Sequence, residues 1–145
     1  MKRRIAIAAL LAALLPLHLY GQEAKKAQPP KDKYRVVFQV SDNDPAKWNL
    51  ALNNARNVQQ DLGKENVQIE IVAYGPGLAM LKAESPVAGR LAGALDDNVG
   101  LIACENTMQN NKVSRDEMYG GIAFVMAGVT HIMKRQQEGW AYIRP

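Results

Sequence analysis

The chain has one cysteine, Cys104, which directly follows the apolar run of residues 100–103. The residues after it, 105–110, are compatible with a helix. A thiol at the start of a helix faces free backbone N–H groups and the positive end of the helix dipole, and both favour the nucleophilic thiolate. Burial of the free cysteine as a small apolar side chain is the alternative. The local sequence leaves both open, because the negative charge of Glu105 opposes ionisation of a neighbouring thiol.

Two strands are expected before Cys104. Polar residues 41–44 follow the first, and the Gly-Pro-Gly segment at residues 75–77 follows the second. Because the carboxyl ends of parallel strands meet at one edge of a sheet, where ligands bind in α/β folds, we expect a pocket there with Cys104 partly accessible. Helix capping by Asp44 and a tight turn at residues 75–77 are simpler explanations for part of this pattern. The expected rim of the pocket consists of Asp42, Asn43, Asp44, Gly75, Gly77, Glu105, Asn106 and Thr107.

Other kinds of site find little support in the sequence. His131 is the only histidine after residue 21, so one chain cannot build a metal site from Cys and His ligands. A lone histidine within a helix is also a weak candidate for the base of a cysteine hydrolase. The Gly-Pro-Gly segment at residues 75–77 lacks the length and the lysine of a phosphate-binding loop. We therefore expect neither a metal nor a cofactor.

Stretches rich in β-branched residues alternate with stretches of helical periodicity. After Asp44 and Pro45, a favoured pair for starting a helix, apolar residues recur at helical spacing as far as Leu62. This alternation predicts an α/β fold with a mainly parallel sheet covered on both faces. The predicted strands are residues 34–40, 67–74, 99–103, part of 121–128 and part of 140–145. The predicted helices are residues 45–62, 78–97 in two pieces with Ser85 and Pro86 capping the second, a short one after residue 104, and 129–139.

The N-terminal residues have the pattern of an export signal. Basic residues 2–4 precede the unbroken apolar run of residues 5–15, which is too short for a comfortable membrane span of about 20 residues. We predict a signal peptide at residues 1–21, a flexible linker at 22–33 and a single domain at 34–145. The protein is then periplasmic or secreted, with no attachment to a membrane after cleavage of the signal.

Removal of that signal changes the net charge of the chain. The 145 residues include 18 Lys plus Arg against 14 Asp plus Glu, and three of the basic residues lie in the signal, which leaves 15 against 14. A nearly neutral domain gives no reason to expect binding to nucleic acid or to an anionic membrane surface.

Four segments give the chain a resemblance to a known family. They read VVFQVSDNDPAKWNLALNNARN at residues 36–57, VQIEIVAYGPG at 67–77, ACENTM at 103–108, and GVTHIMKRQQEGWAYIRP at 128–145. Together with the order of elements, they resemble the DsrE/DsrF-like family, in its branch of small exported members. The resemblance implies a three-layer α/β/α fold with a five-stranded sheet. It also implies a homo-oligomer, a trimer or a hexamer, and Cys104 as a carrier of persulfide sulfur for a donor or acceptor protein.

Two functions remain open at this stage. The first is an exported sulfur carrier or sulfurtransferase that holds a persulfide on Cys104, so that any enzymatic activity is sulfur transfer through a single cysteine. The second is a non-catalytic, oligomeric binding or assembly module in which Cys104 is packed in the core. Accessibility of the thiol separates them, because only the first requires Cys104 to react in the folded protein.

Overall fold

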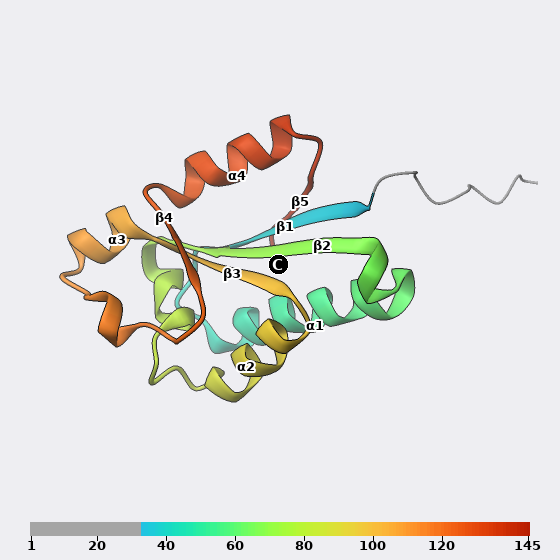
Figure 1. Cartoon of the computed structure of the whole chain (residues 1–145). Coiled ribbons are helices and arrows are strands. Elements are labelled where there is room, and N and C mark those ends of the chain that lie inside the picture. The colour runs from blue at the N-terminus through green and yellow to red at the C-terminus, as the bar shows by residue number, and fades with distance from the viewer. Residues whose placement is uncertain (1–32) are drawn as a thin grey trace, which may run out of the picture.

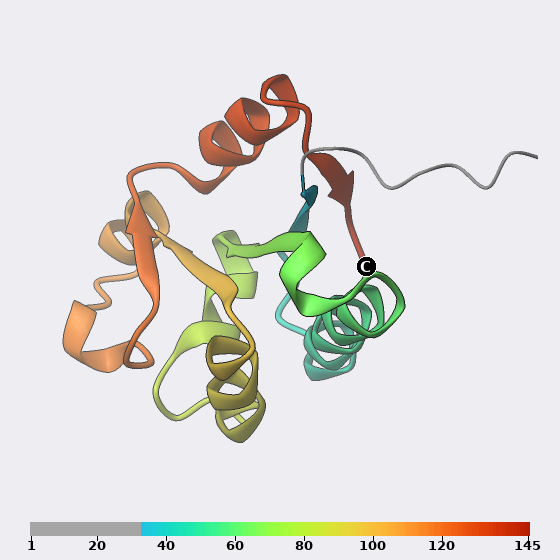
Figure 2. The same ribbon diagram turned by 45° about the vertical axis from the view of Figure 1, so that its right-hand side comes forward.

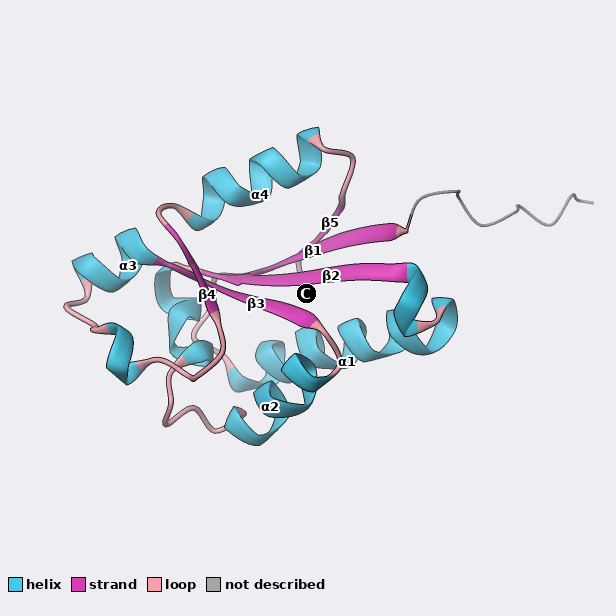
Figure 3. Cartoon of the chain, viewed as in Figure 1, coloured by secondary structure: helices cyan, strands magenta, loops and turns pink. Residues whose placement is uncertain are grey.

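A computed structural model describes residues 33–145, so the predicted signal peptide and nearly all of the predicted linker lie outside the described residues. The fold is built on five strands in the order β4-β3-β2-β1-β5, and every neighbouring pair is parallel (Figures 1 and 3). The strands are β1 Tyr34–Val40, β2 Val67–Ala73, β3 Val99–Cys104, β4 Ala123–Val125 and β5 Ala141–Ile143.

Helices connect the strands and cover both faces of the sheet. Helices α1 and α2 lie against one face and α4 lies alone against the other, whereas α3 lies at the end of β3 (Figures 1 and 2). The α-helices are α1 Pro45–Leu62, α2 Ala88–Asp96, α3 Glu105–Asn110 and α4 Gly128–Gln137. Short 3₁₀ helices are η1 Lys64–Asn66, η2 Gly75–Leu81 and η3 Arg115–Glu117. This arrangement confirms the predicted three-layer α/β/α fold with a five-stranded parallel sheet. None of the helices among residues 33–145 has the length and apolarity needed to cross a membrane.

The two faces of the sheet are covered unequally. The face toward α1 and α2 forms most of the core, in which Phe38, Ile71 and Leu91 are fully buried. The opposite face has a smaller cluster formed by Val37, Val72, Ile102, Ile132 and Trp140. Strands with apolar side chains on both faces are expected for a parallel sheet between two layers of helices.

The first helix begins where the sequence predicts it. The carboxylate of Asp44 accepts a hydrogen bond of 2.9 Å from the N–H of Ala46, and Pro45 is the first helical residue. The indole N–H of the buried Trp48 donates to the carbonyl of Asp42 at 2.7 Å. The helix ends at Gly63, where φ is 86°, a value that favours glycine.

Two details between β2 and β3 differ from the prediction. The 3₁₀ helix η2 replaces the expected tight turn at residues 75–77 and the first expected helical piece. The second piece, α2, begins after Val87, whose cap position has no side-chain hydrogen bond. Ser85 is therefore not the helix cap, although its hydroxyl accepts a hydrogen bond of 3.4 Å from the N–H of Val87. The prediction placed the cap two residues too early because Ser-Pro is also a common start of a turn.

The glycine Gly77 allows η2 to approach the end of β1. A Cβ atom at this position would lie 2.4 Å from the carbonyl oxygen of Val40 and 2.9 Å from the Cα atom of Ser41. Neither backbone atom can move without moving the end of β1, so only glycine fits here. This contact holds the segment after β2 against the segment after β1, at the edge of the sheet where Cys104 ends β3.

We expect Gly77→Ala to lower the free energy of unfolding by about 1–3 kcal/mol, the usual cost of overpacking a well-packed site. Gly93→Ala is the matched control, because a Cβ at Gly93 in the interior of α2 meets nothing within 4 Å. The control should raise the free energy of unfolding by about 0.5–1 kcal/mol through better helix propensity. Urea unfolding followed by circular dichroism measures both. Equal stabilities of the two variants would contradict the close approach of η2 to β1.

Candidate functional site

The single thiol lies where two helices begin. Cys104 is the last residue of β3, and α3 starts at the next residue. It pairs in register with Val125 of β4, and α4 starts three residues after Val125, at Gly128. The parallel pairing of β3 and β4 therefore brings the N-termini of both following helices to one sulfur atom.

Hydrogen-bond donors surround the sulfur atom of Cys104. Burial raises the pKa of the Cys104 thiol, but the hydroxyl of Thr107 and the backbone N–H groups of Gly128, Thr107 and Asn106 lower it. The net result is a pKa below the ordinary value for cysteine. A thiolate in this position has its negative charge stabilised by hydrogen bonds and by two helix N-termini, even though the site is poorly solvated.

Little of the thiol is open to solvent. Cys104 is 5% exposed, and its Sγ atom lies 3.8 Å from the carbonyl oxygen of Met126, to which the thiol donates. The expectation that Cys104 is partly accessible is therefore wrong for the single chain. Residues that follow β3 and β4 cover the sulfur. Of these, Thr107 and Gly128 favour the thiolate, whereas the carbonyl of Met126 favours the neutral thiol.

Thr107 connects the thiol to the segment after β2. The Oγ1 atom of Thr107 accepts a hydrogen bond of 3.0 Å from the N–H of Gly75, where φ is 53°. Because the oxygen accepts from Gly75, its own proton is free to point toward Cys104. Gly75 and Thr107, both predicted site residues, are thus joined to the thiol in one chain of hydrogen bonds.

A tyrosine at the end of β2 also lies near the thiol. Burial raises the pKa of Tyr74, and the ionisable groups of Tyr142 and Cys104 raise it further, while the positive charge of Arg144 opposes them. The N–H of Tyr74 donates to the carbonyl of Val40 at 3.1 Å, which anchors this residue to the end of β1. A phenol that stays protonated is a hydrogen-bond donor beside the sulfur site.

The remaining predicted rim residues after β1 have mainly structural contacts. Asp42 forms ion pairs with Lys47 at 3.0 Å and with Arg144 at 3.4 Å, and its hydrogen bond with Lys47 is the largest cause of its lowered pKa. Asp44 caps α1, and the side chain of Asn43 is exposed. The structure places these residues at the carboxyl edge of the sheet, but it records no contact between them and Cys104.

The rim residues after β3 differ in what they contribute. Glu105 forms an ion pair with Arg115, whose guanidinium lies 4.5 Å from the centre of the Phe124 ring. The negative charge that opposes ionisation of the thiol is thus compensated by a neighbouring cation. Asn106 contributes its backbone, since its N–H donates to the carbonyl of Met126 at 3.0 Å and also lies within reach of the thiol.

Sequence reasoning missed three participants. Gly128, Met126 and Tyr74 contact or influence the thiol, and two of them follow β4, a strand far from Cys104 in sequence. The only available signal was a glycine, Gly128, directly before the predicted helix of residues 129–139. The proximity of Gly128 to the thiol depends on β4 being the neighbour of β3, and the order of strands in the sheet could not be predicted from the sequence pattern.

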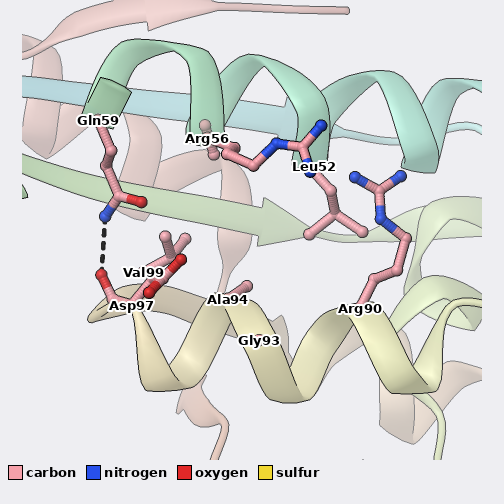
Figure 4. Close-up of a pocket in the computed structure, with 9 residues that line it drawn as sticks. Leu52, Arg56, Gln59, Arg90, Gly93, Ala94, Asp97 and Val99 are labelled. Carbon is pink, nitrogen blue, oxygen red and sulfur yellow. Dashed lines mark hydrogen bonds between the residues drawn. The ribbon is translucent and has the colours of Figure 1, made fainter. Parts of the chain in front are cut away.

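The two helices on one face of the sheet enclose a cavity. A groove of about 280 Å³ lies between α1 and α2 and is lined by Arg56 and Gln59 of α1 and Arg90 of α2, among others (Figure 4). A hydrogen bond of 2.7 Å from Gln59 to the carbonyl of Asp97 closes one end of it (Figure 4). Cys104 is not among its lining residues. Within residues 33–145, no three His, Cys, Asp or Glu side chains gather in a way that could hold a metal ion.

Comparisons with known proteins agree with this architecture. The sequence pattern of the DsrE/DsrF-like family matches residues 32–145. The chain is similar to the solved structure of MTH1491, a protein of unknown function from Methanobacterium thermoautotrophicum, with 40% identity and a TM-score of 0.74. That match covers 78% of this chain and 100% of the other. No curated protein matches the chain.

Two more distant structures share the fold. BT1422, a conserved protein of unknown function from Bacteroides thetaiotaomicron, is 14% identical with a TM-score of 0.58, and the match covers 77% of this chain and 94% of that one. The ychN protein from E. coli is 12% identical with a TM-score of 0.62, and the match covers 79% and 99%. At such identities the similarity concerns the fold alone.

We expect Thr107→Val to raise the pKa of Cys104 by about one unit, because a thiolate loses one charge-assisted hydrogen bond. Thr107→Ser is the matched control, since it keeps the hydroxyl and should leave the pKa near that of the wild type. The measurement is the rate of iodoacetamide reaction at Cys104 as a function of pH, with thermal unfolding to verify the fold. Equal midpoints for the Val and Ser variants would contradict the assigned role of the hydroxyl.

Proposed function

The chain belongs to the DsrE/DsrF-like family, and from this premise we propose that it carries sulfur as a persulfide on Cys104. The single observation that carries the proposal is the set of hydrogen-bond donors directed at the sulfur of Cys104, which lower its pKa despite burial. A structural cysteine in an apolar core has no need of such donors, whereas a nucleophilic thiolate does. The family resemblance suggests sulfur transfer as the reaction. The polar groups around Cys104 support its sulfur as the atom that carries the transferred sulfur.

The proposed reaction is an exchange between sulfur atoms. The Cys104 thiolate attacks the outer sulfur of a donor persulfide, R–S–SH, and the bond between the two donor sulfurs breaks. The electron pair leaves with the donor as R–S⁻, and Cys104 becomes Cys–S–SH with the proton still on the transferred sulfur. No net oxidation occurs, so the step needs neither a metal nor an organic cofactor. Transfer to an acceptor thiolate is the same step with Cys104 persulfide as the donor.

The hydrogen bonds at the site suit both states of the thiol. Before transfer, the hydroxyl of Thr107 and the N–H of Gly128 stabilise the attacking thiolate. When the persulfide passes its outer sulfur to an acceptor, the same donors stabilise the returning thiolate as the leaving group. Because Cys104 is only 5% exposed, we propose that small donors such as inorganic polysulfide reach it most readily.

Export and assembly are part of the same proposal. We infer a periplasmic or secreted protein from the signal pattern of residues 1–21, which lie outside the described part of the chain. We also infer a homo-oligomer, a trimer or a hexamer. In support, Met126, which lies two residues before α4, and Val129 and Met133 of α4 are exposed at helical spacing, with exposures of 63%, 61% and 50%, and we call them the exposed apolar stripe. Exposed apolar patches of this kind are typical of protein interfaces.

A second candidate function is a non-catalytic binding or assembly module. Its specific support is the burial of Cys104, which is typical of a packed free cysteine. The two functions differ in one observable, the reaction of Cys104 in the folded protein. If folded wild-type protein resists alkylation while urea-unfolded protein reacts at once, the assembly module is the better account.

We expect protein purified from its native compartment to lack residues 1–21 and to carry an added mass of about 32 Da, one sulfur atom, on Cys104. Polysulfide should restore this mass after reduction, and the rate should fall as the pH drops through the thiol pKa, because the thiolate is lost. Cys104→Ser should abolish loading and keep the fold. Loading that persists in Cys104→Ser, or a wild type that takes up no sulfur, would contradict the proposal.

We expect the mature protein to form a trimer or a hexamer at micromolar concentration, measured by light scattering. Met133→Lys should weaken this assembly, because it places a charge in the exposed apolar stripe. Lys134→Met is the control, since it removes a charge at the next position of α4 without adding one to the stripe. A monomeric wild type would count against the assembly.

A further inference from the structure

We propose that Glu70, His131 and Arg135 form a clamp that holds α4 on the sheet, so that the start of α4 stays beside Cys104. These three residues, the α4 clamp, are positioning residues for the thiol and do not contact the transferred sulfur. The inference rests on the proposed function, because it concerns the same thiol.

The α4 clamp joins the middle of β2 to the sheet-facing side of α4. One carboxylate oxygen of Glu70 lies 2.7 Å from the Nε2 atom of His131 and accepts a hydrogen bond of 2.9 Å from the Nε atom of Arg135. The other oxygen accepts a hydrogen bond of 2.6 Å from the Nη2 atom of Arg135. The Glu70 side chain is 13% exposed, so these bonds lie largely out of water, where they are strong and directional.

The neighbouring strand leaves room for this carboxylate. Gly100 of β3 pairs with Glu70, and a Cβ atom at Gly100 would lie 3.2 Å from the Cγ atom of Glu70. A larger residue at this position would push the Glu70 side chain aside. The sheet is therefore shaped to place one carboxylate under α4.

Apolar packing holds α4 only weakly. The sheet-facing positions of α4 are Gly128, His131, Ile132 and Arg135, which follow the spacing of one helical face. Of these, Ile132 alone adds a large buried apolar side chain. The α4 clamp occupies the two other side-chain positions, so it determines where the helix rests on the sheet.

The position of α4 matters because its first turn is part of the thiol site. The N–H of Gly128 is one of the donors that lower the pKa of Cys104. Gly128 itself sits tightly on β2, since a Cβ there would lie 3.2 Å from the side chain of Tyr74 and 3.3 Å from that of Val72. The α4 clamp lies one to two turns further along the same rigid helix. A helix that shifts at the clamp therefore shifts at Gly128 as well.

The other contacts of Arg135 involve residues that follow α4 in the chain. Its guanidinium lies 4.7 Å from the centre of the Trp140 ring and donates to Glu138 at 2.8 Å. Glu138 follows α4 directly and is three residues from Arg135, so that ion pair is local. Among residues 33–145, Glu70 is the residue of β2 to which Arg135 donates hydrogen bonds.

The test is the pH dependence of iodoacetamide reaction at Cys104 in Glu70→Gln. The midpoint of the profile should rise by about half a pH unit, the size of one interaction at a helix N-terminus. Electrostatics alone predicts the opposite direction, because loss of a negative charge lowers the pKa of a nearby thiol. A rise therefore supports displacement of the donors, and Arg135→Lys, which changes no charge, tests the same displacement. The rate at high pH reports accessibility of the thiol separately.

Two further variants complete the experiment. Glu138→Gln is the matched control, since it removes a carboxylate partner of Arg135 that does not connect α4 to β2, and its midpoint should equal that of the wild type. Arg135→Lys keeps the positive charge but loses the bidentate hydrogen bonds to Glu70. The midpoint of its alkylation profile should therefore also rise. It keeps the test decisive if Glu70→Gln fails to fold. The charged and ionisable groups nearest the thiol, Tyr74 and Glu105 with Arg115, are unchanged in every variant.

An unchanged or lowered midpoint in a folded Glu70→Gln or Arg135→Lys would overturn the inference. Failure of this inference can be distinguished from failure of the proposed function. A wild type that is alkylated at Cys104 but takes up no sulfur contradicts the proposed function only, because the comparison of midpoints does not involve sulfur transfer.

Discussion

The contacts of polar groups with the sulfur of Cys104, which favour its thiolate form, are the interactions on which the rest of the site depends. They exist because β3 and β4 are parallel neighbours in a register that pairs Cys104 with Val125. Both strands then end at the same edge of the sheet, and the helices that follow them begin beside one atom. A helix N-terminus has free N–H groups, and two of them within reach of a thiol stabilise its negative charge. Burial opposes this effect, but the thiol pKa remains below its ordinary value.

Several features far from the sulfur serve this arrangement. The close approach of Gly77 to the backbone of Val40 holds the segment after β2 in place, and the N–H of Gly75 in that segment fixes the hydroxyl of Thr107. On the other face, the contacts of Glu70 with α4 keep the start of that helix over the end of β3. Small displacements in either layer would weaken the hydrogen bonds, because such bonds are short and directional. The site therefore depends on the whole α/β/α arrangement.

Local features of the chain were sufficient to predict the elements and the position of the thiol. The cap at Asp44, the alternation of strands with helices and the place of Cys104 at a strand end all follow from short-range patterns. The role of Gly128 could not be predicted in this way, because it depends on which strands are neighbours. Glu70 likewise occupies a position in an alternating strand that is typical of a solvent-facing residue, and its partners lie more than sixty residues away. The expected accessibility of Cys104 was wrong partly for the same reason, since some of the residues that cover it follow β4.

Cys104 is buried and yet ionises more easily than an ordinary cysteine. The most direct measurement is the absorbance of the thiolate near about 240 nm during a titration from about pH 5 to 10, taken as the difference between wild type and Cys104→Ser. We expect a single transition with a midpoint below that of the same thiol in urea-unfolded protein. A midpoint at or above that value would contradict it, because burial would then outweigh the hydrogen bonds from Thr107 and the two helices.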